Sequence, residues 1–399
     1  MKKLKILHTV EFYYPSIGGA QEVVRRLSER MVAAGHDVTV ATTKMPNRKN
    51  LVHNGVKIVE FDVSGNKVNG FKGKDQKKYQ EYLIKSDFDV IMGYAAQQWT
   101  ADLLFEVIDK IKAKKIFVPC GYSALYDPTY KKYFDALPSI LKKYDATVYL
   151  SYDYRDINFA REHKIKNIRI IPNGADEHEF TDPLTHERKV FLRNKYGIGG
   201  FTIMTIGLYG EKGHLDTLRT FKKLPVSKAT FLSVGSTRPD DGNYREFAEQ
   251  AALVNNRRKF VGKRVIMVDG DHRDDIRDLL KMCDVFVFLS NIECSPLVLF
   301  EAAAAGVPFL ATPAGNSAEI AEWTGAGVIV KAHPSHNSRV VADQKDTLIK
   351  LTKLALNRKL REKLGRDGKK SWQEKFTWER LAKEYLTLYE EVITSGKKK

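Results

Sequence analysis

The sequence is poor in cysteine, in long apolar runs and in the commonest catalytic signatures. Its three cysteines, Cys120, Cys283 and Cys294, are too few and too scattered for a disulfide framework or a metal-binding cluster, which favours a reducing, cytoplasmic setting. No apolar run approaches the roughly 18 residues that cross a bilayer. Near the start, His8 and Glu11 interrupt the apolar segment, so it predicts a first strand and no signal peptide. No G-x-S-x-G, P-loop or G-x-G-x-x-G pattern is present, which removes the simplest signs of a serine hydrolase, a P-loop enzyme or a dinucleotide-binding protein.

Positive charge is abundant but uneven. The net charge is +17, and residues 1–150 carry 24 basic and 16 acidic residues, whereas residues 351–399 carry 14 and 7. No nucleic-acid-binding motif accompanies this charge, so we expect no nucleic-acid partner. One segment mixes lysines with aromatic residues, which leaves open either peripheral association with an anionic membrane or an ordinary solvated helix face. Its residues are Tyr130, Lys131, Lys132, Tyr133, Phe134, Lys142 and Lys143.

Apolar runs of strand length alternate with helical patterns along the whole chain, which predicts an α/β fold with mostly parallel sheets. With 399 residues, two domains are expected. Turn residues cluster at Asn173-Gly174-Ala175-Asp176, and the strand-helix pattern starts again after them. We therefore predict domains at residues 1–175 and 176–375, followed by a helical tail over 376–399. The predicted strands cover residues 4–10, 37–43, 56–62, 88–94, 114–119, 146–151, 168–172, 201–209, 229–236, 264–270, 283–290, 308–312 and 326–330.

The stretch from Ser290 to Glu319 organises the second half. A Val- and Phe-rich strand ends at Ser290, and Ser295 and Pro296 have the character of a helix N-cap and a first helical residue. The helix ends before Gly306. A helix N-terminus at the carboxyl end of a parallel strand favours an anion such as a phosphate.

Two glutamates frame that helix N-terminus, and their surroundings resemble the retaining GT-B glycosyltransferases of family 4. Glu293 and Glu301 are separated by seven residues, with Pro296-Leu297 between them and E-A-x-A-x-G-x-P starting at Glu301. Further likenesses are Gly315-Asn316-x-x-Glu319, the first loop with Tyr14-Pro15, Gly18-Gly19 and Gln21, the turn at Asn173, Lys212-Gly213, and the tail from Phe376. The resemblance implies two Rossmann-like domains facing across a cleft, with the last helix returning to the first domain.

It also implies a function: transfer of a sugar from a UDP-, GDP- or ADP-sugar to a glycan, lipid-linked or polysaccharide-precursor acceptor, with retention of anomeric configuration. Glu293 and Lys212 are then the predicted catalytic residues. The predicted donor-binding residues are Gly18, Gly19, Lys212, Ser295, Pro296, Leu297, Val298 and Glu301. Gly235, Asp271 and His272 are expected near the nucleotide base, and Tyr122 and Gln97 near the acceptor. No metal or other cofactor is expected, and Asp271, the second aspartate of the D-x-D triplet at Asp269, is interpreted as the start of a helix.

The sequence departs from the family pattern in ways that keep two alternatives open. Leu208 stands where an arginine is usual, Cys294 stands where glycine is usual, and no histidine occurs near Cys120 and Gly121. The alternatives are another GT-B enzyme, such as a sugar-nucleotide epimerase or a phosphorylase, and a non-catalytic GT-B binding protein.

Overall fold

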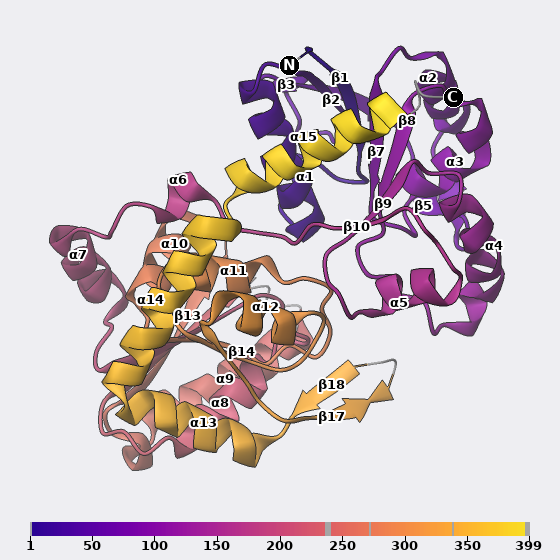
Figure 1. Cartoon of the computed structure of the whole chain (residues 1–399). Coiled ribbons are helices and arrows are strands. Elements are labelled where there is room, and N and C mark those ends of the chain that lie inside the picture. The colour runs from indigo at the N-terminus through magenta and orange to yellow at the C-terminus, as the bar shows by residue number, and fades with distance from the viewer. Residues whose placement is uncertain (1, 236–240, 271–272, 337–338, 396–399) are drawn as a thin grey trace. The chain divides into compact units, whose positions relative to one another are not determined.

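The computed structural model describes residues 2–235, 241–270, 273–336 and 339–395. The chain divides into two compact units (Figure 1). Unit 1 contains Met1–Asn173 and Trp378–Lys399, and unit 2 contains Gly174–Thr377. These limits lie within two residues of the boundaries expected from the turn at Asn173 and from the start of the tail.

Unit 1 is built on an eight-stranded sheet in the order β10-β9-β8-β7-β1-β2-β4-β3, and all its strand pairs are parallel except β3 with β4. Its central strands are buried along most of their length, as their Val- and Ile-rich runs predict. A short hairpin, β5–β6, forms a separate sheet. The strands are β1 (Lys5–Thr9), β2 (Asp37–Thr43), β3 (Val52–His53), β4 (Val56–Phe61), β5 (Ser64–Asn66), β6 (Gly70–Lys72), β7 (Val90–Tyr94), β8 (Lys114–Val118), β9 (Ala146–Tyr149) and β10 (Ile168–Ile170).

Amphipathic helices pack on this sheet. They are α1 (Gly19–Ala33), α2 (Gln76–Lys85), α3 (Trp99–Val107), α4 (Lys131–Leu141), α5 (Arg155–Glu162) and α15 (Trp378–Ser395), with short 3₁₀ turns at Ile108–Lys110 and Pro128–Tyr130. The aromatic residues of the lysine-rich segment are not available to a membrane, because Tyr130, Tyr133 and Phe134 are buried in the core of unit 1. Only the lysines of that segment are exposed, as on an ordinary solvated face.

The last helix belongs to unit 1 although the 204 residues of unit 2 precede it. Helix α15 packs against α1 and buries Leu381, Tyr385 and Tyr389. The Tyr389 hydroxyl lies 3.0 Å from Nε2 of His8 on β1, and Nδ1 of His8 lies 2.8 Å from Ser28 Oγ. Because the Ser28 hydroxyl donates to the Val24 carbonyl, Nδ1 of His8 is the donor to Ser28. Nε2 is then an acceptor for the Tyr389 hydroxyl, and a stronger one than Met92 Sδ, which lies 3.2 Å from the same hydroxyl. Complete burial lowers the pKa of His8 from 6.5 to about 3, so this link is made by a neutral ring.

Unit 2 has a six-stranded parallel sheet in the order β13-β12-β11-β14-β15-β16. Adjacent residues point to opposite faces, so Ile203 and Phe231 pack in one apolar cluster while Met204 and Leu232 pack in another. A separate antiparallel hairpin, β17–β18, follows β16. The strands are β11 (Phe201–Ile206), β12 (Ala229–Gly235), β13 (Lys263–Asp269), β14 (Val285–Phe288), β15 (Phe309–Ala311), β16 (Gly327–Ile329), β17 (Ala332–Ser335) and β18 (Arg339–Ala342).

Helices supply the other wall of each apolar cluster in unit 2. Residues of α8, α9 and α13 pack with Ile203, and residues of α10, α11, α12 and α14 pack with Met204. The helices are α6 (Glu177–Phe180), α7 (His186–Tyr196), α8 (His214–Lys223), α9 (Gly242–Asn256), α10 (Arg273–Met282), α11 (Leu297–Ala304), α12 (Ser317–Thr324), α13 (Gln344–Leu356) and α14 (Arg358–Lys375), with a 3₁₀ turn at Arg258–Phe260.

The buried neutral His8 predicts acid sensitivity of unit 1. Its folded-state pKa lies below the unfolded value, so protonation favours the unfolded state and the stability contribution is lost as pH falls below 6.5. Between pH 6.5 and 4.5 wild type should lose about 2 kcal/mol more unfolding free energy than His8→Gln. Urea denaturation at both pH values measures this. Equal losses in the two proteins would contradict it, and His163→Gln, at an exposed histidine that forms the C-cap of α5, is the control.

Candidate functional site

The carboxyl ends of neighbouring strands bring the predicted loops of unit 2 together. Gly207 follows β11, Gly235 ends β12, and Gly270 follows β13. The Gly270 N–H donates to the Gly235 carbonyl at 3.1 Å, and a Cβ on Gly235 would lie 2.6 Å from the Gly207 carbonyl oxygen. The missing side chains therefore let three loops approach closely at the edge of the sheet where parallel α/β proteins bind ligands.

Helix α11 begins one residue later than the sequence indicated. Its first residue is Leu297, and its N-cap is Pro296, so the expectation that Ser295 caps the helix and Pro296 starts it was wrong. Pro296 has no N–H, and the first free amides of the helix therefore belong to Leu297 and Val298, both half-buried. Ser295 is buried beside them. The helix ends at Ala304 before the left-handed Gly306, as its sequence predicts.

The two predicted catalytic residues meet in the structure. Nζ of Lys212 donates to Oε1 of Glu293 at 2.6 Å, and the Ser290 hydroxyl donates to the same oxygen at 2.8 Å. Both charged side chains are largely shielded, with 22% of Lys212 and 12% of Glu293 exposed. Lys212 comes from the loop after β11 and Glu293 from the loop after β14, and β11 and β14 are adjacent strands. The structure thus holds an ammonium group and a carboxylate together beside the start of α11.

Glycines in left-handed conformations shape the loops that carry this pair. Gly213 has φ +73, and a Cβ there would lie 2.3 Å from the Leu289 carbonyl oxygen. Gly315 has φ +59, and a Cβ there would lie 2.4 Å from the Cys294 carbonyl oxygen and 2.8 Å from Cβ of Glu293. The Asn316 N–H also donates to the Cys294 carbonyl at 2.9 Å. The Gly315-Asn316 pair of the sequence motif is therefore the support on which the Glu293 loop rests.

His214 is a site residue that sequence reasoning did not single out. It is fully buried at the start of α8, with Nε2 3.1 Å from the Gly207 carbonyl and Nδ1 2.8 Å from Ser233 Oγ. Since the carbonyl only accepts, Nε2 carries the proton and Nδ1 accepts from Ser233. Burial lowers the pKa of His214 to about 4, so the ring stays neutral and holds the loop before Lys212. The available signal in the sequence was its position directly after Gly213, in the Lys212-Gly213 motif.

Glu301 lies one turn into α11 and has a cationic neighbour. Nη2 of Arg273 lies 3.7 Å from Oε1 of Glu301 and 3.1 Å from Oε2 of Glu179, on α6. Glu301 is 19% exposed and Glu179 is 17% exposed, whereas Arg273 is 46% exposed. Arg273 was not predicted, because nothing in the sequence links residue 273 to residues 179 and 301.

The predicted residues of the first loop lie in unit 1, at the start of α1. Gly18 is the N-cap, with an extended φ of 173, so neither the cap nor the helix requires the left-handed freedom of glycine. A Cβ on Gly19 would meet no atom within 4 Å, which leaves open space before the amides of α1. Their contact with a donor stays a prediction.

The two predicted acceptor residues lie at the carboxyl ends of β7 and β8. Gln97 has φ +62, its N–H donates to the Tyr133 hydroxyl at 3.2 Å, and that hydroxyl donates to Oδ1 of Asp102 at 2.8 Å. Burial raises the pKa of Asp102 to about 6. The Tyr122 ring, by contrast, is 1% exposed and packs between Phe134 and Phe159. It fills the core where the sequence predicted a lining position, so the Tyr122 side chain is not an acceptor contact in this structure.

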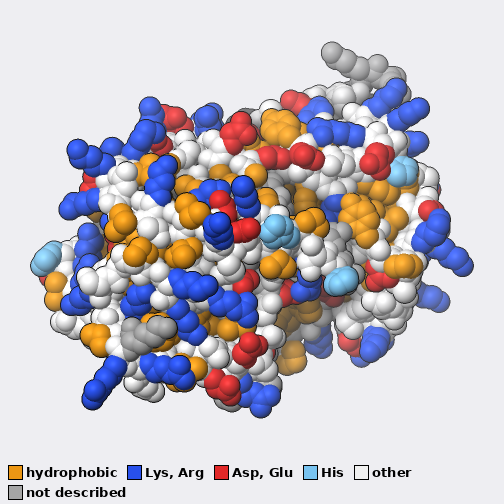
Figure 2. Space-filling model, turned by 90° about the horizontal axis from the view of Figure 1, so that it is seen from below, with side chains coloured by type: hydrophobic (Ala, Val, Ile, Leu, Met, Phe, Trp, Pro, Cys, Tyr) orange, Lys and Arg blue, Asp and Glu red, His pale blue; other side chains and the backbone are white. Residues whose placement is uncertain are grey.

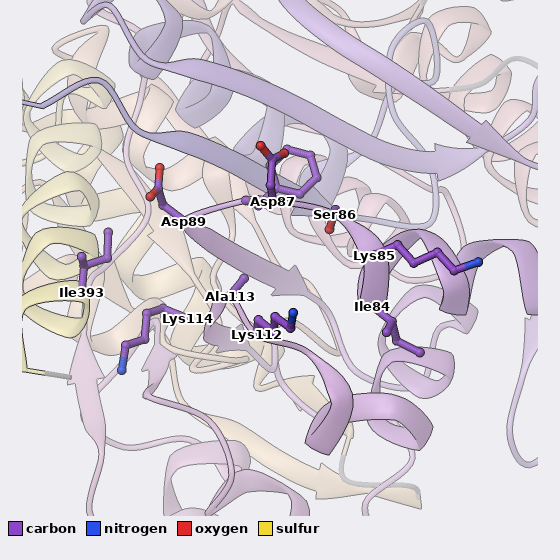
Figure 3. Close-up of a pocket in the computed structure, with 10 residues that line it drawn as sticks. Ile84, Lys85, Ser86, Asp87, Asp89, Lys112, Ala113, Lys114 and Ile393 are labelled. Carbon is purple, nitrogen blue, oxygen red and sulfur yellow. The ribbon is translucent and has the colours of Figure 1, made fainter. Parts of the chain in front are cut away.

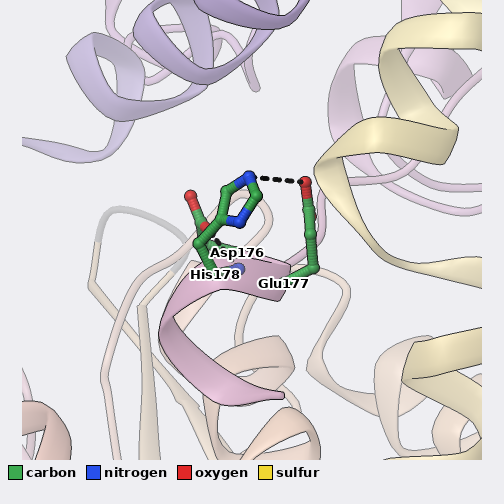
Figure 4. A group of neighbouring side chains, drawn as sticks. All are labelled: Asp176, Glu177 and His178. Carbon is green, nitrogen blue, oxygen red and sulfur yellow. Dashed lines mark hydrogen bonds and ion pairs between the residues drawn. The ribbon is translucent and has the colours of Figure 1, made fainter. Parts of the chain in front are cut away.

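The remaining predictions concern the nucleotide base and metal ions. Asp271 and His272 lie outside the described residues. Among the described residues, Asp176, Glu177 and His178 form a group close enough to share an ion (Figure 4). The Asp176 carboxylate accepts from the His178 N–H at 2.7 Å and so caps α6, while Nε2 of His178 lies 4.0 Å from Oε1 of Glu177. The cap accounts for Asp176, and we assign no metal to this group.

A pocket of about 660 Å³ lies elsewhere in unit 1 (Figure 3). Its walls include Asp89 before β7, Lys114 at the start of β8 and Ile393 of α15, so it opens at the amino ends of the strands. Lys114 pairs with Asp145 at 2.8 Å. The predicted residues lie at the opposite, carboxyl ends, so this pocket is separate from them.

The surface carries mixed charge. On the face shown in Figure 2, Lys and Arg side chains are interspersed with acidic and apolar ones and do not form one continuous patch. In the part of the chain that the structure describes, no helix has the length and apolar character to span a bilayer.

Two family models match the sequence and together cover most of it. Glycosyl transferases group 1 matches residues 193–371, and Glycosyltransferase Family 4 matches residues 17–179. The chain belongs to this family of glycosyltransferases. It is 25% identical to N-acetyl-alpha-D-glucosaminyl L-malate synthase of Bacillus anthracis over 99% of both chains. The family prediction and the prediction of a glycosyltransferase enzyme are confirmed.

Solved structures show the same fold. Sucrose-phosphate synthase from Thermosynechococcus elongatus superposes with a TM-score of 0.76 at 18% identity, over 98% of this chain and 100% of that chain. Anabaena HepE, solved in complex with UDP and glucose, superposes with a TM-score of 0.73 at 14% identity, over 97% and 100%. The glycosyltransferase is therefore a GT-B protein with two Rossmann-like units, as its sequence predicted.

The support of the Glu293 loop gives a stability prediction. Gly315→Ala should cost about 2 kcal/mol more unfolding free energy than Gly325→Ala, because only the first forces the Cys294 backbone and Glu293 to move. Gly325 is a matched control with φ +67, and its added Cβ would lie 3.5 Å from Cβ of Asp367, an ordinary contact. Chemical denaturation followed by circular dichroism measures both. Equal costs would show that Gly315 is required for its φ alone.

Proposed function

We propose that this glycosyltransferase moves a sugar from a nucleotide diphosphate sugar to a glycan, lipid-linked or polysaccharide-precursor acceptor, with retention of anomeric configuration. The observation that carries the proposal is the Lys212–Glu293 pair beside the start of α11, at 2.6 Å. A UDP-, GDP- or ADP-sugar is the donor class, and the structure of HepE in complex with UDP and glucose supports a nucleotide donor.

The donor diphosphate would be held by positive charge from two sources. The amides of Leu297 and Val298 open at the start of α11, where the helix dipole favours an anion. Lys212 adds a full charge that the structure keeps 22% exposed. Negative charge grows on the departing nucleoside diphosphate during transfer, so a fixed ammonium stabilises the transition state more than the bound donor.

The two glutamates would hold the hydroxyl groups on either side of the diphosphate. A carboxylate only accepts hydrogen bonds, which suits sugar hydroxyls. Glu301 would bind the ribose, and Glu293, already oriented by Lys212 and Ser290, would accept from the transferred sugar. In this assignment Glu293 has a second role, since it fixes the direction in which Lys212 points.

Transfer with retention needs no enzyme base in this scheme. The bond from the anomeric carbon to the diphosphate oxygen breaks, the acceptor hydroxyl attacks from the same face, and the departing phosphate oxygen takes the acceptor proton. The absence of a nucleophile motif in the sequence supports this, as does the neutral, buried state of His214, which leaves that ring occupied by the Gly207 carbonyl and Ser233.

Acceptor recognition is proposed to involve the loops after β7 and β8 in unit 1, with Gln97 as the candidate side chain. Gln97 Oε1 lies 3.3 Å from both the Ser123 hydroxyl and the Ala124 N–H, so one residue joins the two loops. A screen should combine UDP-, GDP- and ADP-sugars with glycan and lipid-linked acceptors. It should include L-malate, because a relative that matches over 99% of both chains is named N-acetyl-alpha-D-glucosaminyl L-malate synthase.

The role of Lys212 predicts a defect in turnover. Lys212→Ala should lower kcat by about 100- to 1000-fold with a much smaller change in donor KM, and Lys212→Arg should recover part of the rate. Steady-state kinetics with the donor found in the screen measures this. Lys223→Ala, at an exposed lysine that ends α8, the helix following the Lys212 loop, is the control. A Lys212→Ala enzyme with an unchanged kcat would remove Lys212 from the proposed mechanism.

The role of Glu301 predicts a defect in nucleotide binding. Glu301→Gln should weaken UDP, GDP or ADP binding by about tenfold, the loss of one good hydrogen bond to a charged group. Isothermal titration calorimetry measures it, with the exposed Glu322→Gln of α12 as control. Failure of wild type to bind any of the three at millimolar concentration would favour a non-catalytic binding protein. An epimerised donor or consumption of phosphate would favour the other GT-B enzymes.

A further inference from the structure

A hairpin that the sequence did not predict contacts two loops of unit 2. These donor loops are the one after β11, which carries Lys212, and the one after β14, which carries Glu293. Strands β17 (Ala332–Ser335) and β18 (Arg339–Ala342) form their own two-stranded sheet after β16, apart from the six-stranded sheet (Figure 1). The Val340 N–H donates to the Asn291 carbonyl at 2.9 Å, and Nδ2 of Asn291 donates to the Val340 carbonyl at 2.8 Å. Asn291 lies two residues before Glu293, so the hairpin is tied to the loop that carries this glutamate.

The same hairpin also contacts the loop that carries Lys212. Nη2 of Arg339 lies 2.7 Å from Oε1 of Glu211, the residue directly before Lys212. The Glu211 carbonyl accepts from the Asn291 N–H at 2.9 Å and lies 3.3 Å from the Ser290 hydroxyl. Arg339 and Asn291 thus bring hairpin and both donor loops into one hydrogen-bonded group.

The Arg339–Glu211 pair is too exposed to be a strong structural link. Arg339 is 42% exposed and Glu211 is 36% exposed, and ion pairs of this kind contribute little to folding stability. The pair matters more for the charge near the donor site than for folding stability, because Glu211 is next to Lys212, which the diphosphate would contact. Without Arg339, Glu211 would keep no ion pair among the described residues, and its charge would add to that of Glu293 near Lys212.

We propose that Arg339 is a positioning residue that neutralises Glu211 and keeps this carboxylate directed away from Lys212, so that the ammonium and the α11 amides remain available to a nucleoside diphosphate. In the loop after β11, Leu208 stands where the family usually has an arginine and is 58% exposed, and Arg339 brings a cation to Glu211 of the same loop. This inference rests on the proposed donor site, and it adds a residue to that site from a segment outside the matched motifs.

Calorimetric titration with UDP, GDP and ADP at low salt distinguishes two roles of Arg339. It either neutralises the charge of Glu211 or only holds the hairpin against the loop, which we call a structural tie. Arg339→Ala should weaken binding by about threefold to tenfold, the size expected for one screened charge. Arg339→Lys should bind as wild type does. Glu211→Ala should bind at least as tightly as wild type, and the double variant Arg339→Ala with Glu211→Ala should return to within about twofold of wild type. A structural tie predicts instead that all three alanine variants weaken binding equally.

The controls separate failure of this inference from failure of the proposed function. Arg358→Ala removes an exposed arginine that pairs with Glu362 at 2.7 Å on α14, and it should leave binding unchanged. The Arg339→Ala defect should shrink in 0.5 M NaCl, where about 4 Å of water already screens a charge. If wild type binds a nucleotide and Arg339→Ala binds it with the same affinity, the inference is overturned and the donor site stands. The same holds if the double variant binds as weakly as Arg339→Ala. Absence of wild-type binding to all three nucleotides overturns the donor site and the inference together.

Discussion

The position of one ammonium group, that of Lys212, is the constraint on which unit 2 depends. The parallel order of the strands places the loops after β11 and β14 at the same edge, because these two strands are neighbours. Left-handed glycines then let the loops approach closely, and the neutral ring of His214 holds the Gly207 carbonyl. A partly shielded cation needs a counter-charge, and Glu293 supplies it without neutralising the helix start beside it. Fold, loop geometry and electrostatics therefore converge on one side chain.

Much of this arrangement could be predicted from the sequence. Runs such as those around Ile203, Phe231 and Phe286 are β-branched, aromatic and short, and they are bounded by turn residues, so their strands are found within two or three residues of the expected limits. The family motif also placed Glu293, Glu301 and Lys212 correctly in one unit, since such motifs record which loops meet at the edge of a sheet.

The failures have physical causes. Tyr122 follows a strand in the manner of a site residue, but the backbone at Cys120, Gly121 and Tyr122 is left-handed, and the ring turns into the core. Whether a polar or aromatic residue after a strand faces outward depends on φ, which its neighbours in sequence do not determine. The hairpin β17–β18 was missed because its strands have four residues each and one contains Pro334. Arg273 and Arg339 contact glutamates that are distant in the sequence, and a local sequence pattern does not predict such contacts.

The return of α15 to unit 1 has a consequence for biosynthesis. His8 and Tyr389 are 381 residues apart, and the strand that carries His8 leaves the ribosome long before the helix that covers it. At about 5–20 residues per second, this interval is roughly 20 to 80 seconds. Unit 2 is continuous in sequence and can fold during that time. The N-terminal core stays open until α15 has been synthesised, so chaperones that shield apolar surface would meet the first half of the chain, and termination before α15 would leave this core incomplete.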